Sequence, residues 1–283
     1  MTDTSPTVRQ RELGLRLRKL RTGLGMTVED VAEKLLCSTA KISRMETGAR
    51  RPVLRDVRDL CTLYDVDESV TAELMKLTRE AREQGWWNQY GDLNLTPYIG
   101  LEQEASSITA YCMHYVHGLA QTEQYAREII KAIAPKIDTA THQQRVEARL
   151  RRQQLLEEKD PPRYRLLIDE AVLHRPVGGP AIMAAQLQRI LDLVASGKAT
   201  VQVIPFDAGA YSVCDISFTL LEFGEPLLVP IVYVESLAAH QYYERAVDVS
   251  RYRESIEYIR DSALSPRDSV QRLTGMRSTY SGE

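Results

Sequence analysis

The sequence predicts two domains of different fold class: an all-α domain over residues 1–83 and a mixed α+β domain over residues 98–283. In the first segment, apolar residues recur at helical spacing. From Arg163 onward, strand-sized apolar runs alternate with helical segments. Between the two, residues 84–97 lose this periodicity and gain Gly, Asn and Pro, which predicts a linker.

The N-terminal segment is predicted to form five short helices. They are expected at residues 9–22, 28–35, 39–47, 52–64 and 67–83, the fourth opened by Pro52 with Val53 on its apolar side. Thr27, with Asp30 three residues later, forms a capping-box variant before the second helix, and Ser38 caps the third. Gly48 stands just past the end of the third helix, where glycine is preferred. The short spacing of the second and third helices matches a helix-turn-helix domain.

The third helix has the layout of a helix that reads the major groove of double-stranded DNA. Ile42 and Met45 form an apolar back, and the front is predicted to consist of Thr39, Ala40, Lys41, Ser43 and Arg44. Arg44 suits a bidentate contact with guanine, and the two residues at the helix start suit a thymine methyl group.

Four further residues are predicted to contact the DNA backbone. Thr27 and Ser38 stand at helix starts, where free amide donors suit phosphate oxygens. Arg50 and Arg51 follow the third helix and suit the backbone or the minor groove.

Charge divides the chain in the same way. Residues 9–58 contain 13 Lys/Arg and 6 Asp/Glu, a net charge of +7, while the remainder contains 23 basic and 33 acidic residues, a net charge of −10. This asymmetry favours a polyanionic partner for the first domain only. The alternative, a basic face that is merely solvated, leaves the joint spacing of Ser38, Ile42, Glu46, Gly48 and Pro52 unexplained.

Residues 26–52 resemble the phage-repressor (Cro/C1, or XRE) helix-turn-helix family. The shared pattern is a Thr/Ser-opened helix, then S-x-x-x-I-S-x-x-E-x-G and a basic-Pro tail. The resemblance implies a structural role for Glu46. Leu36 departs from the pattern, because the family usually has glycine between the two helices. A left-handed leucine costs roughly 1 kcal/mol or more, which favours a turn of another geometry and a tilted third helix.

In the second domain, the periodicity predicts both helices and strands. Helices are expected at 101–115, 122–134, 139–158, 180–196 and 240–263, with a last short helix opened by Ser265 and Pro266. Strands are expected at 164–168 and 200–205, and a hairpin at 216–223 and 228–234.

Five segments of this domain resemble a domain of unknown function (DUF5753-like) that is common in actinobacterial regulators. They are residues 98–105, 118–127, 174–179, 203–206 and 233–236. His117 stands where that family more often has proline. The resemblance implies the order of domains and an antitoxin-like regulator with a small partner protein. It does not imply a ligand.

The sequence does not indicate an enzyme, a metal site or a cofactor. His114 and His117 are spaced for one helix face, as are His240 and Glu244, but zinc needs three or four ligands and no CxxC or HExxH spacing is present. There is no GxSxG elbow or phosphate loop. Seven tyrosines suit either a pocket or ordinary packing: Tyr111, Tyr115, Tyr125, Tyr211, Tyr233, Tyr242 and Tyr243.

The expected protein is a cytoplasmic, sequence-specific transcriptional regulator. Its four cysteines form no CxxC pair and are expected to be reduced, and no apolar run is long enough for a membrane span. A homodimer is expected, because a single short helix gives too little specific affinity for DNA and two half-sites are needed. Two roles stay open for the second domain: binding a small-molecule ligand that changes DNA affinity, or binding a protein. The alternative function is an antitoxin-like or anti-factor protein whose DNA binding is autoregulatory.

Overall fold

The structure is a computed structural model that describes residues 8–51, 53–83, 85–93, 96–211, 215–224, 229–236 and 239–282. The chain divides into two compact units. One comprises Met1–Glu104 and Gly224–Leu228, and the other Ala105–Phe223 and Val229–Glu283. The first is helical and the second combines a sheet with helices, which confirms the predicted fold class.

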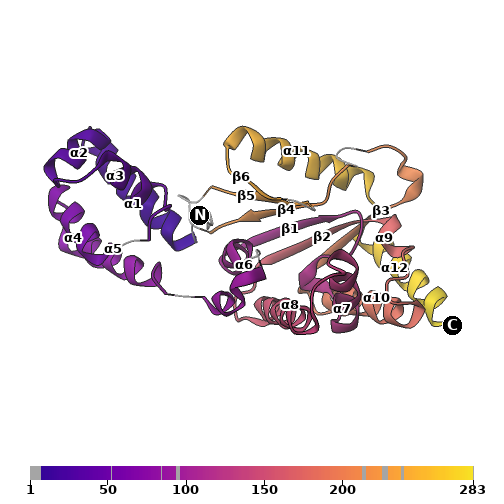
Figure 1. Ribbon diagram of the computed structural model, residues 1–283. Coiled ribbons are helices and arrows are strands. Elements are labelled where there is room, and N and C mark those ends of the chain that lie inside the picture. The colour runs from indigo at the N-terminus through magenta and orange to yellow at the C-terminus, as the bar shows by residue number, and fades with distance from the viewer. Residues whose placement is uncertain are drawn as a thin grey trace. The chain divides into compact units, whose positions relative to one another are not determined.

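Five helices form the first part of the N-terminal unit (Figure 1). They are α1 (Val8–Gly23), α2 (Val28–Lys34), α3 (Thr39–Glu46), α4 (Leu54–Leu63) and α5 (Glu68–Glu80). One apolar core joins all five, and it includes Leu17, Val31, Ile42, Leu60 and Leu74. The five predicted helices are therefore confirmed, with one difference: Val53 caps α4 and is 40% exposed. Pro52 lies outside the described residues.

The segment predicted as a linker contains helical structure. A 3-10 helix, η1, covers Trp86–Leu93, and α6 covers Thr96–Gln103. The Trp86 indole donates to Gln103 Oε1 at 3.4 Å, and its ring meets that of Trp87 edge-on at 5.9 Å. These contacts give the segment an aromatic cluster of its own. The domain boundaries drawn from the sequence stay a prediction.

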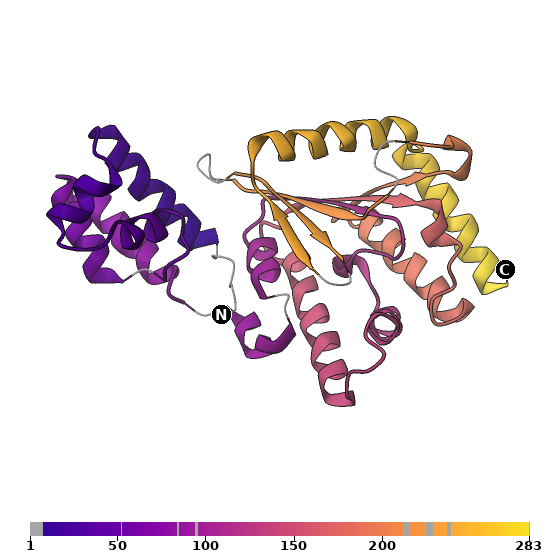
Figure 2. The same ribbon diagram turned by 45° about the horizontal axis from the view of Figure 1, so that its top comes forward.

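The second unit is built on one six-stranded mixed sheet in the order β3-β2-β1-β4-β5-β6 (Figure 2). Its strands are β1 (Ser107–Cys112), β2 (Arg163–Asp169), β3 (Thr200–Ile204), β4 (Phe218–Glu222), β5 (Ile231–Glu235) and β6 (His240–Tyr243). β1, β2 and β3 run parallel, and β4, β5 and β6 continue the sheet from β1 in antiparallel pairs. The predicted hairpin is confirmed as β4 and β5.

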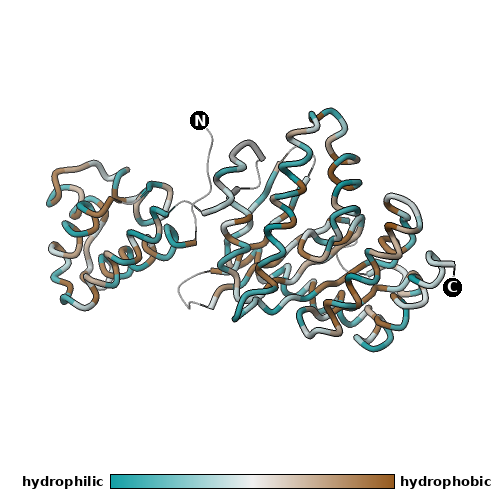
Figure 3. Tube along the Cα trace, turned by 90° about the horizontal axis from the view of Figure 1, so that it is seen from below, coloured by the Kyte–Doolittle hydropathy of each residue, from teal (hydrophilic) through white to brown (hydrophobic). Residues whose placement is uncertain are grey.

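Helices cover both faces of this sheet (Figures 1 and 2). α11 (Ala246–Ser262) lies on one face, while α7 (Glu123–Ile133), α8 (Thr139–Arg152) and α10 (Pro180–Ala195) lie on the other. The remaining elements are η2 (Gly118–Ala120), η3 (Gln153–Glu157), α9 (Glu170–Leu173), η4 (Phe206–Ala208) and α12 (Pro266–Ser281). Val249, Ile256 and Ile259 of α11 share one apolar core with Leu167 and Phe218 of the sheet. In Figure 3, the helices alternate hydrophilic and hydrophobic residues, as one-sided burial requires.

The edge of β3 is protected by the segment that leads into α12. The amide of Leu264 donates to the carbonyl of Val203 at 2.9 Å, and the amide of Val203 donates to Ser269 Oγ at 2.9 Å. These bonds occupy backbone groups that would otherwise pair with another strand. The predicted last helix does begin at Pro266, but it extends over 16 residues and is not short.

Two predicted helices of this domain are wrong in part. Residues 101–115 were expected to be helical, but Ser107–Cys112 form β1, all six of whose residues are buried. A strand buried on both faces shows no alternation, so periodicity alone does not distinguish it from a buried helix. Residues 240–263 were expected to be one helix, but His240–Tyr243 form β6 and α11 begins only at Ala246.

Cys37, Cys61 and Cys112 are free thiols, and Cys214 lies outside the described residues. No helix in the described part of the chain has the length and hydrophobicity to cross a membrane.

Candidate nucleic-acid interface

α2 and α3 are joined by a short turn whose ends are capped as the sequence predicts. The amide of Asp30 donates to Thr27 Oγ1 at 3.1 Å, and the amide of Thr27 donates to Asp30 Oδ2 at 2.7 Å, which completes the capping box. The amide of Lys41 donates to Ser38 Oγ at 3.2 Å. These local bonds define where both helices begin, independently of the rest of the fold.

The turn itself is left-handed at Leu36, whereas the sequence predicted a turn of another geometry. Leu36 has φ +50°, and its side chain is 94% exposed. The amide of Cys37 donates to the carbonyl of Ala32, and the amide of Leu36 to that of Glu33, which is a Schellman motif. The expected turn of another geometry is therefore wrong, because the Schellman hydrogen bonds hold a leucine in the place usually taken by glycine.

α3 is held against α1 by close packing and by a buried ion pair. A Cβ atom at Gly14 would lie 2.5 Å from the carbonyl oxygen of Glu46, so only glycine permits this approach of the two helices. Arg21 donates from Nε and Nη2 to the Glu46 carboxylate at 2.6 and 2.9 Å, and from Nη1 to the Met26 carbonyl at 2.6 Å. The hydrogen bonds that Arg21 donates to Glu46 raise the pKa of Arg21. The structural role that the family resemblance implies for Glu46 agrees with this geometry.

The outer face of α3 presents short polar side chains and one arginine. Ile42 and Met45 are buried, as predicted, while Thr39, Ala40, Ser43 and Arg44 are exposed. The first turn contains no acidic residue. Arg44 donates from Nε to the carbonyl of Ala40 at 3.1 Å, so its guanidinium lies along the front of the helix.

Lys41 does not lie free on that face. Its Nζ atom is 2.7 Å from Asp56 Oδ1 on α4, and its side chain is half-buried. Arg50 Nη2 is 3.8 Å from the other oxygen of the same carboxylate. Asp56 thus neutralises part of the basic surface, a contact between distant residues that sequence spacing did not indicate.

The two predicted helix-start sites differ from each other. The amide of Thr27 is not a free donor, since it is bonded to Asp30, and Glu29 adds a second acid to the first turn of α2. At the start of α3, Ser38 is exposed and no acid lies nearby in the first turn. Ser38 therefore offers the better place for a phosphate group. Arg51 is exposed beyond α3 and donates from Nη2 to the carbonyl of Arg82 at 2.6 Å.

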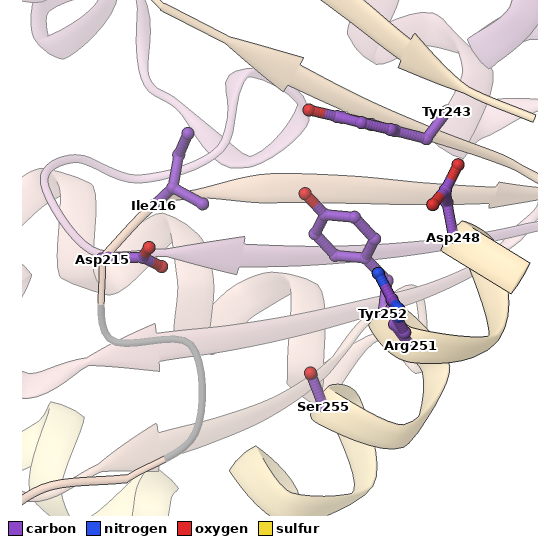
Figure 4. Close-up of a pocket in the computed structure, with 7 residues that line it drawn as sticks. All are labelled: Asp215, Ile216, Tyr243, Asp248, Arg251, Tyr252 and Ser255. Atoms are coloured by element: carbon purple, nitrogen blue, oxygen red, sulfur yellow. The ribbon is translucent and has the colours of Figure 1, made fainter.

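The second unit contains an open cavity of about 550 Å³ between α11, β6 and the chain that precedes β4 (Figure 4). Its lining residues are Asp215, Ile216, Tyr243, Asp248, Arg251, Tyr252 and Ser255. The rings of Tyr243 and Tyr252 lie 5.6 Å apart, and burial raises the pKa of Tyr252. A cavity of this size, lined by aromatic and charged side chains, has the dimensions of a site for a small organic molecule.

Three of the seven predicted tyrosines serve packing. Tyr111, Tyr125 and Tyr233 are buried, and of the set only Tyr243 lines this cavity. The hydroxyl of Tyr211 donates to Asp169 and lies 2.7 Å from that of Tyr111, while burial raises the pKa of Tyr211.

The paired histidine residues do not share a helix face, although their spacing suggested one. His114 and His117 lie in the loop after β1, and His117 Nδ1 is 2.8 Å from the hydroxyl of Tyr164. His240 lies on β6, not on a helix with Glu244, and its Nδ1 is 2.7 Å from the hydroxyl of Tyr233. Among the described residues, no three His, Cys, Asp or Glu side chains gather as metal ligands.

The compact helices, the tight turn and the exposed α3 define the first unit as a helix-turn-helix domain. Residues 12–74 match the family described as "Helix-turn-helix domain", which supports DNA binding and regulation. Residues 95–275, more than half of the chain, match "Domain of unknown function (DUF5753)", and the protein belongs to this family. Comparisons with curated proteins and with solved structures found no match.

Proposed function

We propose that the protein is a sequence-specific transcriptional regulator whose α3 reads base edges in the major groove. The observation that carries this proposal is the outer face of α3, where Thr39, Ala40, Ser43 and Arg44 are exposed without an acidic neighbour in the first turn. A guanidinium reads guanine through two parallel hydrogen bonds. The Arg21–Glu46 pair supports this role, because it holds α3 at one angle to the domain.

Phosphate contacts are assigned to the residues that surround this helix. Ser38 stands at the start of α3, and Arg51 is exposed beyond its end. Lys41 and Arg50 share Asp56, so each contributes less positive charge to the DNA than an unpaired residue would. Thr27 is the weakest of the predicted contacts, because its amide and hydroxyl groups already serve the capping box.

Specific affinity requires two such helices, and we propose a homodimer that binds two half-sites about one helical turn apart. For the second domain, we propose control of DNA binding by a bound small molecule, which the cavity in Figure 4 supports. The alternative is an antitoxin-like protein that acts by binding a small partner protein. Co-purification of such a protein with the full chain would favour this alternative.

The test is genome-wide mapping of binding sites with the full-length protein and with Arg44→Ala. The proposal predicts a shared motif with two symmetric half-sites, and a loss of preference at one base of each half-site in the variant. Light scattering on the free and DNA-bound protein measures the dimer separately. Identical motifs for the two proteins would exclude α3 as the reading helix.

A further inference from the structure

The sheet face beneath α11 has an apolar half and a polar half. Leu167, Phe218 and Ile256 belong to the apolar core on this face. At the other end of the same face, the register places Ser107 beside Arg163, and Thr109 beside Arg165. Thr200 pairs with Arg165 from β3 and so extends the second row. Two arginines and three hydroxyl groups therefore share one end of the sheet.

This polar half is hollowed. One hollow of about 400 Å³ lies at the amino ends of β1, β2 and β3, and it is lined by Ser107, Thr109, Pro161, Pro162, Arg163, Tyr164, Arg165, Gly197, Lys198, Ala199, Thr200 and Glu222. A second hollow of about 330 Å³ adjoins it and shares Thr109, Arg165 and Glu222. Arg165 lies where the two meet, and its side chain is half-buried.

The charges of the larger hollow are not balanced. Glu222 is its one lining acid among the described residues, and Arg253 already binds that carboxylate. Lys198 is paired with Glu157. In the described part of the chain, neither Arg163 nor Arg165 forms an ion pair or a side-chain hydrogen bond. Two guanidinium groups thus line the same space, and neither is in a direct ion pair with a described residue, although Glu257 and Glu222 act on Arg165 at longer range.

Burial lowers the pKa of Arg165, the positive charges of Arg260 and Arg163 lower it further, and Glu257 and Glu222 offset part of this effect. Of these neighbours, Arg260 is already paired with Glu257 at 2.6 Å. A guanidinium nevertheless keeps its proton in proteins, so Arg165 stays charged while half-buried. Such an arrangement is unfavourable in the empty domain. A bound anion would offset it, because a planar guanidinium matches the oxygens of a phosphate or carboxylate.

We propose that this hollow binds a small organic anion through a terminal phosphate or carboxylate group. Arg165 supplies the paired donors, Arg163 adds charge at the open side, and the hydroxyls of Ser107, Thr109 and Thr200 supply further donors. Pro161 and Ala199 offer an apolar wall for the carbon skeleton. The site lies in the second domain and depends on no step of the proposed DNA reading.

The test uses the full-length protein, inorganic pyrophosphate and citrate as probes, and sodium chloride to keep ionic strength constant. Calorimetry measures the affinity, and thermal unfolding measures stabilisation. At a 100-fold excess over Kd, we expect the melting temperature of the second domain to rise by about 5 °C or more. Arg165→Gln should weaken binding of at least one probe by about 10- to 100-fold.

Arg267→Gln is the matched control, because Arg267 is an exposed arginine of the same domain and lies outside the hollow. It should bind the probes like the wild type. Without a probe, Arg165→Gln should unfold at the same temperature as the wild type or higher, since this removes a half-buried charge that forms no direct ion pair with a described residue. A lower unfolding temperature with unchanged probe binding would mean that Arg165 has a structural role, and it would overturn the proposal. The proposal would also be overturned if neither probe bound at a concentration of about 10 mM, since a specific site should bind more tightly than this.

The DNA backbone carries the same phosphate chemistry, and the experiment separates it from a small anion. A contrary outcome is that Arg165→Gln weakens DNA binding and flattens its salt dependence while both probes bind as before. In that outcome Arg165 would contact the DNA phosphates, and the proposal would be wrong. Unchanged DNA binding together with lost pyrophosphate or citrate binding supports the small-anion site.

Discussion

Arg21 and Glu46, which lie 25 residues apart, form a two-point ion pair between α1 and α3, with N···O distances of 2.6 and 2.9 Å. Both side chains are at least nine-tenths buried. The pair joins the end of α3 to α1, the first helix of the domain. The orientation of α3 therefore depends on this contact as well as on the turn that precedes it.

Removal of one partner of this pair should strongly destabilise the N-terminal domain. Glu46→Gln leaves the Arg21 guanidinium buried without a counter-charge, and we expect a loss of about 3–5 kcal/mol in the free energy of unfolding. Urea unfolding followed by circular dichroism measures the loss. The double variant Arg21→Met, Glu46→Leu is the control and should be less destabilised than Glu46→Gln. Equal losses would indicate that packing, not charge, dominates the site.

Leu36→Gly should stabilise the domain. Leu36 has φ +50°, which strains a residue with a Cβ atom, and its exposed side chain contributes little packing. We expect a gain of about 1 kcal/mol in the free energy of unfolding. Leu36→Ala is the control, because alanine keeps the Cβ atom and should give no comparable gain. A loss of stability in the glycine variant would show that the leucine side chain stabilises the turn.

Arg44→Ala and Arg51→Ala should affect DNA binding in different ways. Loss of Arg44 should cost about 1–3 kcal/mol at one base position and relax the preference there. Loss of Arg51 should weaken binding to all sequences alike and reduce the salt slope by about 1. Gel-shift titrations at several salt concentrations, on the mapped operator and on single-base variants, measure both effects. If Arg44→Ala weakened binding to all DNA sequences equally, Arg44 would contact the DNA backbone and not a base.

Acid should weaken the start of α2 in a predictable pH range. The backbone hydrogen bond from Thr27, and then its side-chain hydrogen bond, lower the pKa of Asp30 in the folded state. A lowered pKa stabilises the fold above the unfolded value of about 3.9, and this contribution is lost as pH falls through the folded value. Asp30→Asn should thus be less stable than the wild type near pH 7.

The difference between these two proteins should shrink as pH falls below about 4 and the carboxyl group of the wild type gains its proton. Thermal unfolding between pH 7 and pH 3 measures it. Glu33→Gln is the control, because Glu33 is exposed on the same helix and does not belong to the capping box. A pH-independent difference for Asp30→Asn would show that the charge of Asp30 is irrelevant to the cap.

The helix starts at Thr27, Ser38, Thr122 and Ser265 could all be predicted, because each depends on a hydrogen bond between residues three apart. The strands β1 and β6 could not. β1 is buried along its whole length and so lacks alternation, and β6 is a four-residue edge strand directly before a helix. Their strand conformation depends on pairing with β2 and β4 for β1, and with β5 for β6.

The sequence alone determined the helix-turn-helix spacing, the caps and the polar front of α3, because these features arise from contacts within one or two helical turns. Only the tertiary structure decided that Lys41 meets Asp56, that Leu36 keeps a left-handed turn, and that Arg163 and Arg165 share a hollow. The first contact joins two helices, and the second depends on the competing free energies of strain and hydrogen bonding. The third depends on strand register. A local pattern encodes neither the Lys41–Asp56 contact nor the hollow, since both depend on which distant residues the folded chain brings together. At Leu36, the pattern does not show that hydrogen bonding outweighs strain.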